Sequence, residues 1–142
     1  MDFKKILVPV DFSEEARSAL DTADRMAAEC GASLTLLHIY QPTEVAVLDF
    51  TYVEPPEKIS KICEAADDEL ERWLSELRTP SERLSASVVT GSVANSVIEA
   101  SADFDLVVMS THGRTGITHF LLGSIAERVV QAAKCSVLIV KK

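Results

Sequence analysis

The chain has 142 residues and a formal net charge of −8. This length predicts a single domain, residues 1–142, that buries roughly two-thirds of its unfolded surface. The negative charge argues against a nucleic-acid partner, and no apolar stretch reaches the ~18 residues of a membrane span. Because the N-terminus also lacks the apolar core and cleavage site of a signal peptide, we expect a cytoplasmic protein.

Apolar runs and apolar stripes alternate along the chain. Continuous β-branched runs predict buried strands, and apolar residues at helical spacing predict amphipathic helices. In chain order we expect a strand at 4–10, a helix at 16–30, a strand at 33–40, a helix at 59–77, a strand at 85–90, a helix at 93–101, a strand at 105–109, a helix at 122–133 and a strand at 136–140. This alternation implies an α/β fold, a doubly wound parallel sheet with helices on both faces.

The connection at residues 41–56 (QPTEVAVLDFTYVEPP) is unusually long for a compact domain. It shows no clear period, yet it is too apolar for a solvated linker. We therefore expect either a flap over the ligand-binding edge of the sheet or a surface for a partner protein.

A small-residue loop, STHGRTG at residues 110–116, follows the fourth strand, and Gly123-Ser124 comes shortly after it. Such loops can hold phosphate, because backbone N–H groups point inward and a helix N-terminus adds partial positive charge. From Ser110 onward there are five cations and one acid, a balance of +4, whereas residues 1–109 carry −12. An anionic ligand would be attracted to this segment.

Three segments meet at one edge of the expected sheet. In an open doubly wound sheet, ligands bind beyond the carboxyl ends of the strands, where the strand order reverses. If the first and fourth strands are neighbours there, residues 9–11 lie beside residues 110–113, and residues 90–92 face the same edge. Because all three segments are expected at the same edge of the sheet, we expect a ligand site there.

Asp11 and Ser124 each admit two interpretations. Asp11 with Glu14, and Ser124 with Glu127, fit helix capping boxes. Alternatively, Asp11 accepts hydrogen bonds from a ribose or nucleobase or contacts a bound Mg²⁺, and Ser124 donates to phosphate. The sequence leaves both roles open at both positions.

Several enzyme signatures are missing. The sequence contains no GxxxxGK[ST] loop, no GxGxxG after the first strand and no GxSxG elbow. Its three cysteines and three histidines have neither disulfide-framework nor metal-ligand spacing. A phosphoacceptor receiver domain would need acids where Phe12 and Thr90 stand. No catalytic residue is assigned, although His112 or Asp11 could position water for a slow hydrolysis.

Over essentially its whole length the sequence resembles the universal stress protein family. The matching pieces are KKILVPVDFSEEA, LTLLHIY, VTGSVANSVIEA and VVMSTHGRTGITHFLLGSIAERVVQAAKCSVLIV. Nucleotide-binding members carry G-x-x-G, nine residues, then G-S/T. Here Ser110 stands in place of the first glycine, Gly113 matches the second, and Gly123-Ser124 ends the motif.

The resemblance implies a Rossmann-like, adenine nucleotide alpha-hydrolase-like domain with strand order 3-2-1-4-5, which forms a homodimer and binds ATP, with or without Mg²⁺. Adenine is expected near Asp11 and Ile39, and ribose and phosphates along the small-residue loop. The predicted nucleotide-binding set is Pro9, Val10, Asp11, Ile39, Gly91, Met109, Ser110, His112, Gly113, Arg114, Gly123, Ser124 and Ile125. The last strand is expected to pair across the dimer through Val137, Leu138, Ile139 and Val140.

Two alternatives to an ATP-binding stress-response module stay open: a slow ATPase, and a nucleotide-free dimeric interaction protein with an unknown protein partner. The backbone at Ser110 bears on the choice. If that position requires a positive φ, serine costs about 1–2 kcal/mol, a loss of about 5- to 30-fold in affinity. If the backbone is extended, serine is harmless there.

Overall fold

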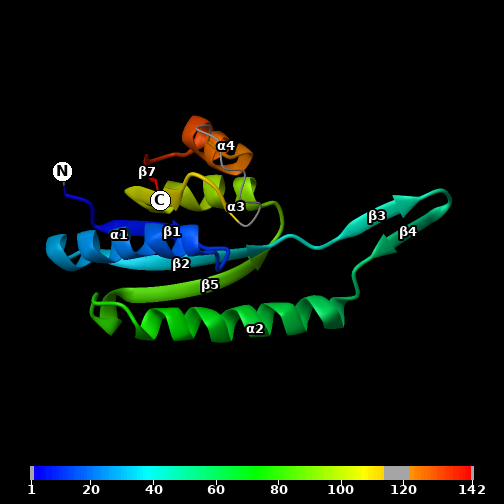
Figure 1. Ribbon diagram of the computed structural model, residues 1–142, viewed down its shortest axis with the longest axis horizontal. Helices are drawn as coiled ribbons and strands as arrows, with labels where there is room; N and C mark the ends of the chain where they lie inside the picture. The colour runs from blue at the N-terminus through cyan, green and yellow to red at the C-terminus, as the bar shows by residue number, and fades with distance from the viewer. Residues whose placement is uncertain (1, 114–121, 142) are drawn as a thin grey trace.

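Five parallel strands form the central sheet in a computed structural model that describes residues 2–113 and 122–141 (Figure 1). The strands are β1 (Lys5–Pro9), β2 (Ser33–Tyr40), β5 (Leu84–Thr90), β6 (Leu106–Ser110) and β7 (Ser136–Val140). Their spatial order is β5-β2-β1-β6-β7. When these five strands are numbered along the chain, the order reads 3-2-1-4-5, and the predicted fold class is confirmed.

Helices cover both faces of the sheet (Figure 1). On one face lie α1 (Glu14–Cys30) and α2 (Pro56–Ser75), and on the other lie α3 (Val93–Ala100) and α4 (Ser124–Ala132). Short 3-10 turns at Ser81–Arg83 and Ser101–Asp103 precede β5 and β6. None of the helices within the described ranges is both long enough and apolar enough to cross a membrane.

Strand β1 shows how the core forms on the two faces. Successive side chains of a strand point in opposite directions. Ile6 and Val8 therefore pack with α1 and α2, while Leu7 packs with α3 and α4. All three side chains are buried, as a parallel sheet covered on both faces requires.

The connection between β2 and α2 contains a β-hairpin, which was not predicted for residues 41–56. Strands β3 (Glu44–Val47) and β4 (Phe50–Val53) pair antiparallel around the two-residue turn Leu48-Asp49. The hairpin extends beyond the sheet, away from the helices (Figure 1).

A buried carboxylate holds the base of this hairpin. Glu54 is only 2% exposed, and it accepts hydrogen bonds from the Tyr40 hydroxyl at 2.7 Å and the Thr43 N–H at 3.0 Å. Lys58 Nζ lies 3.2 Å from Glu54 Oε1. The Glu54 N–H in turn donates to Thr43 O at 3.2 Å. These bonds fix the direction in which the hairpin leaves the sheet.

The Glu54 cluster predicts a loss of stability in acid. The hydrogen bonds from Thr43 and Tyr40, assisted by Lys58, hold the pKa of Glu54 below its ordinary value of 4.5, although burial alone would raise it. A lowered folded-state pKa contributes stability that is present above pH 4.5 and disappears as the pH falls through the folded value.

Chemical unfolding of the wild type and Glu54→Gln at several pH values measures this contribution. We expect the free energy of unfolding of the wild type to exceed that of Glu54→Gln most near neutral pH. This difference should shrink as the pH falls below the ordinary pKa of a glutamate. The exposed Glu64→Gln change serves as the control and should follow the wild type throughout. A difference in free energy of unfolding between the two proteins that did not vary with pH would contradict a lowered pKa for Glu54.

Candidate functional site

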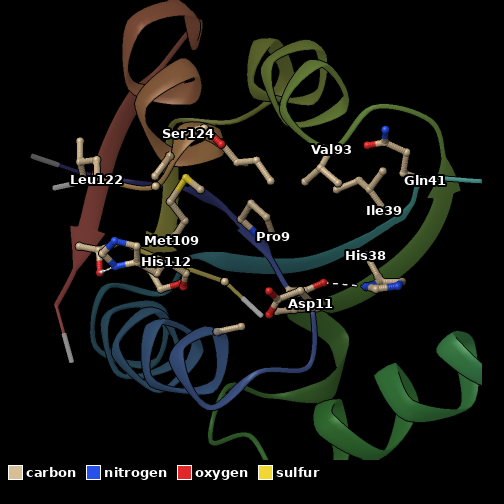
Figure 2. Close-up of a pocket in the computed structure, with 18 of the residues that line it drawn as sticks. Pro9, Asp11, His38, Ile39, Gln41, Val93, Met109, His112, Leu122 and Ser124 are labelled. Carbon is tan, nitrogen blue, oxygen red and sulfur yellow. Dashed lines mark hydrogen bonds between the residues drawn. The ribbon is translucent and has the colours of Figure 1, made fainter. Parts of the chain in front are cut away.

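A cavity of about 650 Å³ opens at the carboxyl ends of β1 and β6. Its volume lies in the usual range for small-molecule sites. Strands β1 and β6 are the neighbours at which the strand order reverses, which is where doubly wound sheets bind ligands. Figure 2 shows side chains from separate elements around one space, among them Pro9, Ile39, Met109 and Ser124.

Most of the predicted nucleotide-binding residues line this cavity, namely Pro9, Val10, Asp11, Ile39, Met109, Ser110, His112, Gly113, Gly123, Ser124 and Ile125. Gly91 is not among the described lining residues. Its N–H donates to Tyr40 O at 2.9 Å, and its φ of 142° favours glycine. Arg114 lies outside the residues that the structure describes.

The cavity also has lining residues that were not predicted, namely Ala16, His38, Tyr40, Gln41, Val93, Thr111, Leu122 and Ala126. Tyr40 and Gln41 stand at the carboxyl end of β2, and Val93 begins the helix after β5. The rule that ligands bind at strand ends could have found these three. No local sequence signal marks Ala16 or Ala126 as cavity residues.

The chain turns after β1 through Phe12, whose φ of 62° is unusual for an aromatic residue. The Phe12 ring centroid lies 4.6 Å from that of His38 and 5.4 Å from that of Trp73. His38 Nδ1 also bonds to Val10 O at 2.7 Å, and because a carbonyl only accepts, Nδ1 carries the hydrogen. These contacts fix the backbone on both sides of Asp11.

Ser13, not Asp11, caps helix α1, so the predicted capping box at Asp11 was wrong. Ser13 Oγ accepts from the Ala16 N–H at 3.1 Å. Asp11 Oδ1 accepts from the Ser13 N–H at 3.0 Å and from the Ser13 hydroxyl. Its other oxygen, Oδ2, lies against Gly113. The carboxylate therefore sits between the start of α1 and the small-residue loop.

A hydrogen bond joins the start of the small-residue loop to the N-terminus of α4. The Gly123 N–H donates to Thr111 O at 2.8 Å. A Cβ at Gly123 would lie 3.1 Å from that same oxygen, and a Cβ at Gly113 would overlap Asp11 Oδ2. Close approach of the backbone therefore explains glycine at both positions.

Ser110 occupies ordinary extended backbone. It is the last residue of β6 and pairs with Val140 of β7. Among the described residues, the non-glycine positions with positive φ are Phe12 and Leu48. The Ser110 hydroxyl donates to His112 O at 2.7 Å, within the loop. The serine Cβ therefore brings no left-handed backbone strain, and its hydroxyl stabilises the turn.

Helix α4 begins at the cavity. Its N-cap is Gly123 and no side chain caps this end, so the capping-box interpretation of Ser124 and Glu127 was wrong. Ser124, Ile125 and Ala126 form the first turn and line the cavity. The N–H groups of a first helical turn carry partial positive charge. This end of the cavity therefore suits an anion.

The cavity thus has an apolar part and a polar part. Pro9, Ile39, Val93 and Met109 supply apolar walls (Figure 2), and the polar part is lined by Ser110, Thr111 and the first turn of α4. Asp11 is the one acidic side chain among the described lining residues. No group of three His, Cys, Asp or Glu side chains placed to hold a metal ion occurs within the described ranges.

Comparison with other sequences identifies the family. The profile of the Universal stress protein family matches residues 2–141. Universal stress protein MJ0531 from Methanocaldococcus jannaschii is 32% identical, over 99% of this chain and 83% of that protein. Universal stress protein A homolog 1 from Coxiella burnetii is 32% identical, over 99% of this chain and 97% of its own length.

Solved structures share the fold. Universal stress protein UspA from Lactobacillus plantarum has a TM-score of 0.79 at 24% identity, over 99% of both chains. Hypothetical protein MJ0577 has a TM-score of 0.77 at 25% identity, over 100% of this chain and 98% of its own. A universal stress protein in complex with cAMP has a TM-score of 0.64 at 24% identity, over 99% of this chain and 98% of its own. The chain belongs to the universal stress protein family.

Proposed function

We propose that this protein is a cytoplasmic, ATP-binding regulatory module that responds to stress. The ATP lies in the cavity at the ends of β1 and β6. Its adenine ring packs against the apolar walls near Ile39, Val93 and Met109, where a flat heterocycle gains from burial. Asp11 lies at the same cavity and accepts a hydrogen bond from the nucleoside.

The phosphates of ATP lie at the polar end. The Gly113 backbone, the Gly123-Ser124 peptide and the first turn of α4 offer donors to phosphate oxygens. Arg114 adds positive charge in this proposal. Mg²⁺, when present, is held by phosphate oxygens with Asp11 as a direct or water-mediated ligand.

The observation that carries the proposal is the hydrogen bond between Gly123 and Thr111. The Gly123 N–H to Thr111 O bond brings the two glycine positions of the motif to one end of the cavity. Neither glycine has free space for a Cβ. The solved cAMP complex of a structural neighbour supports an adenine nucleotide as the class of ligand.

We further propose that the protein forms a homodimer joined through β7. Within the described residues, β7 pairs with β6 and with no other strand, which leaves one edge of the sheet open. Val137, Leu138, Ile139 and Val140 form this apolar edge. Pairing with the same strand of a second copy would satisfy its backbone groups and protect it from aggregation.

Release and titration of nucleotide test the proposal. Protein purified and then denatured should release ATP or AMP that chromatography detects, and nucleotide-free protein should give heat on calorimetric titration with Mg-ATP. Absence of both signals would rule out ATP binding and would favour a nucleotide-free dimeric interaction protein.

We predict that Ser110→Gly leaves ATP affinity within about twofold of the wild type. Ser110 lies in extended backbone, so glycine relieves no strain there. Calorimetric titration of both proteins measures the difference. A gain of tenfold or more for the glycine variant, about 1.4 kcal/mol, would mean that the serine obstructs the ligand.

Slow ATP hydrolysis is the second candidate function. His112 lines the cavity, and its Nδ1 lies 3.1 Å from Thr111 Oγ1. Hydrolysis requires a group that positions water opposite the leaving phosphate. Phosphate release should then fall in both His112→Ala and Asp11→Ala, and turnover that survives both changes would remove this assignment.

A further inference from the structure

At the carboxyl end of β2, the cavity is lined by a polar side chain that is not committed to another protein group. Three polar residues line the cavity there, namely His38, Tyr40 and Gln41. His38 donates through Nδ1 to Val10 O at 2.7 Å, and the Tyr40 hydroxyl donates to Glu54 at 2.7 Å. The Gln41 amide makes no hydrogen bond to any residue that the structure describes.

Gln41 projects from the same face of the sheet as Ile39. Side chains two positions apart along an extended chain point to the same side, and Ile39 packs in the apolar cluster on the face of α3 and α4. Figure 2 shows the Gln41 side chain next to Val93 and Ile39, at the edge of the cavity. Both of these apolar residues belong to the walls proposed for adenine. The amide therefore lies beside the proposed position of the base.

The backbone on both sides of Gln41 is held in place. The Tyr40 hydroxyl and the Thr43 N–H both donate to the buried Glu54 carboxylate. Pro42 follows Gln41 directly and favours extended backbone at the residue before it. The Gln41 side chain is exposed, but its point of attachment is fixed. Binding to a ligand therefore orders little besides the side chain itself, which lowers the entropic cost.

The hairpin that follows does not enclose the cavity. The described cavity residues stop at Gln41 and resume at Val93, so none of them belongs to β3 or β4. The hairpin extends beyond the strands of the sheet (Figure 1). The expected flap over the ligand-binding edge was therefore wrong for this chain alone. Gln41 is the last described cavity residue before the hairpin and stands at the rim.

A glutamine amide has the hydrogen-bonding pattern that complements an edge of adenine. Its oxygen accepts and its NH₂ group donates, side by side. Adenine carries the N6 amino donor next to a ring-nitrogen acceptor, and a glutamine amide can bond to both at once. Phosphates, ribose and a flat apolar ring are common to all purine nucleotides. Only a group at the edge of the base can distinguish one purine from another.

We propose, on the basis of the proposed ATP site, that Gln41 is a specificity-determining residue that recognises the adenine base. Its Oε1 accepts a hydrogen bond from the N6 amino group, and its Nε2 donates to the neighbouring ring nitrogen. The ligand class is thereby narrowed from purine nucleotides in general to those with an amino group at C6.

Calorimetric titration with two nucleotides tests this role. Purine riboside triphosphate keeps the ring nitrogens of ATP but has hydrogen in place of the N6 amino group. The ratio of its Kd to the Kd of ATP is measured in the presence of Mg²⁺ for the wild type, Gln41→Ala and Gln131→Ala. Gln131 is a matched control, because it is an exposed glutamine on α4 that is not among the described cavity residues. Both glutamines are exposed, so circular dichroism should show the wild-type unfolding temperature for each variant.

We expect the wild type to prefer ATP, and this preference should fall about 3- to 10-fold in Gln41→Ala, as the loss of a neutral hydrogen bond predicts. Gln131→Ala should keep the wild-type preference. An unchanged preference in Gln41→Ala, including an equal loss of affinity for both nucleotides, would overturn the role of Gln41 while ATP binding stands. A wild type that binds neither nucleotide would overturn the ATP site itself, and this inference with it.

Discussion

Replacing Gly113 by alanine is expected to weaken ATP binding about 5- to 150-fold while the domain stays folded. The added Cβ would overlap Asp11 Oδ2, so the carboxylate and the loop would have to move apart. Displacements of this kind cost about 1–3 kcal/mol, which corresponds to that loss of affinity. Gly113→Val should abolish binding. Calorimetric titration with Mg-ATP gives the affinities, and thermal unfolding shows whether the fold persists.

A substitution at Gly31 serves as a control that distinguishes an effect on ATP binding from an effect on stability. Gly31 ends α1 with a φ of 75° and contributes nothing to the cavity described here. Gly31→Ala should lower the free energy of unfolding by about 1 kcal/mol and leave ATP affinity unchanged. If Gly31→Ala and Gly113→Ala reduced affinity equally, the Gly113 effect would reflect general destabilisation and not the loop.

Replacing Asp24 by alanine is expected to lower the free energy of unfolding by about 2–5 kcal/mol, through loss of a buried hydrogen-bond cluster. Asp24 lies on α1 and is 5% exposed. Its carboxylate accepts from the Arg78 and Thr79 N–H groups, both at 2.9 Å, and from the Thr79 hydroxyl at 2.7 Å. Alanine would leave buried donors of Thr79 without their acceptor, and the melting temperature should fall by roughly 10 °C.

Asp21 offers a matched control on the same helix. Its side chain is 61% exposed and makes an ion pair with Arg17 at 3.2 Å. Exposed pairs contribute little, so Asp21→Ala should change the free energy of unfolding by less than about 1 kcal/mol. Chemical denaturation compares the two variants. Equal effects would mean that the Asp24 cluster does not join α1 to the segment that follows α2.

The sheet could be predicted because its strands carry a strong, continuous apolar signal. Residues 33–40 and 136–140 were predicted with the bounds that β2 and β7 have in the structure. Strands buried on both faces must be apolar at nearly every position. The strand order came from the family resemblance, since apolar runs alone do not say which strands are neighbours.

The hairpin could not be predicted from the same signal. Both faces of β3 and β4 are exposed, so burial imposes no alternation on their four residues each. Its turn is Leu48-Asp49, with Leu48 at a φ of 53°, where a two-residue hairpin usually has asparagine or glycine. The sequence therefore lacked the turn residues that identify a hairpin.

The cavity residues were predicted more closely than the helix caps beside them. Asp11 and Ser124 both fit capping boxes in the sequence, but in the structure the N-caps of α1 and α4 are Ser13 and Gly123. Asp11 accepts hydrogen bonds from Ser13 through Oδ1, and its Oδ2 lies against Gly113. Gly123 is the N-cap of α4 because its C=O accepts from the Glu127 N–H, and its own N–H donates to Thr111 O, twelve positions away, which no local motif encodes.

A crystal structure of the protein grown with Mg-ATP would test the central claim most directly, because it reports both binding and location. We predict density for adenine against Ile39 and Met109, with the phosphates at Gly113 and the first turn of α4. A cavity without nucleotide at saturating ATP, or ATP bound elsewhere on the molecule, would contradict the proposed function.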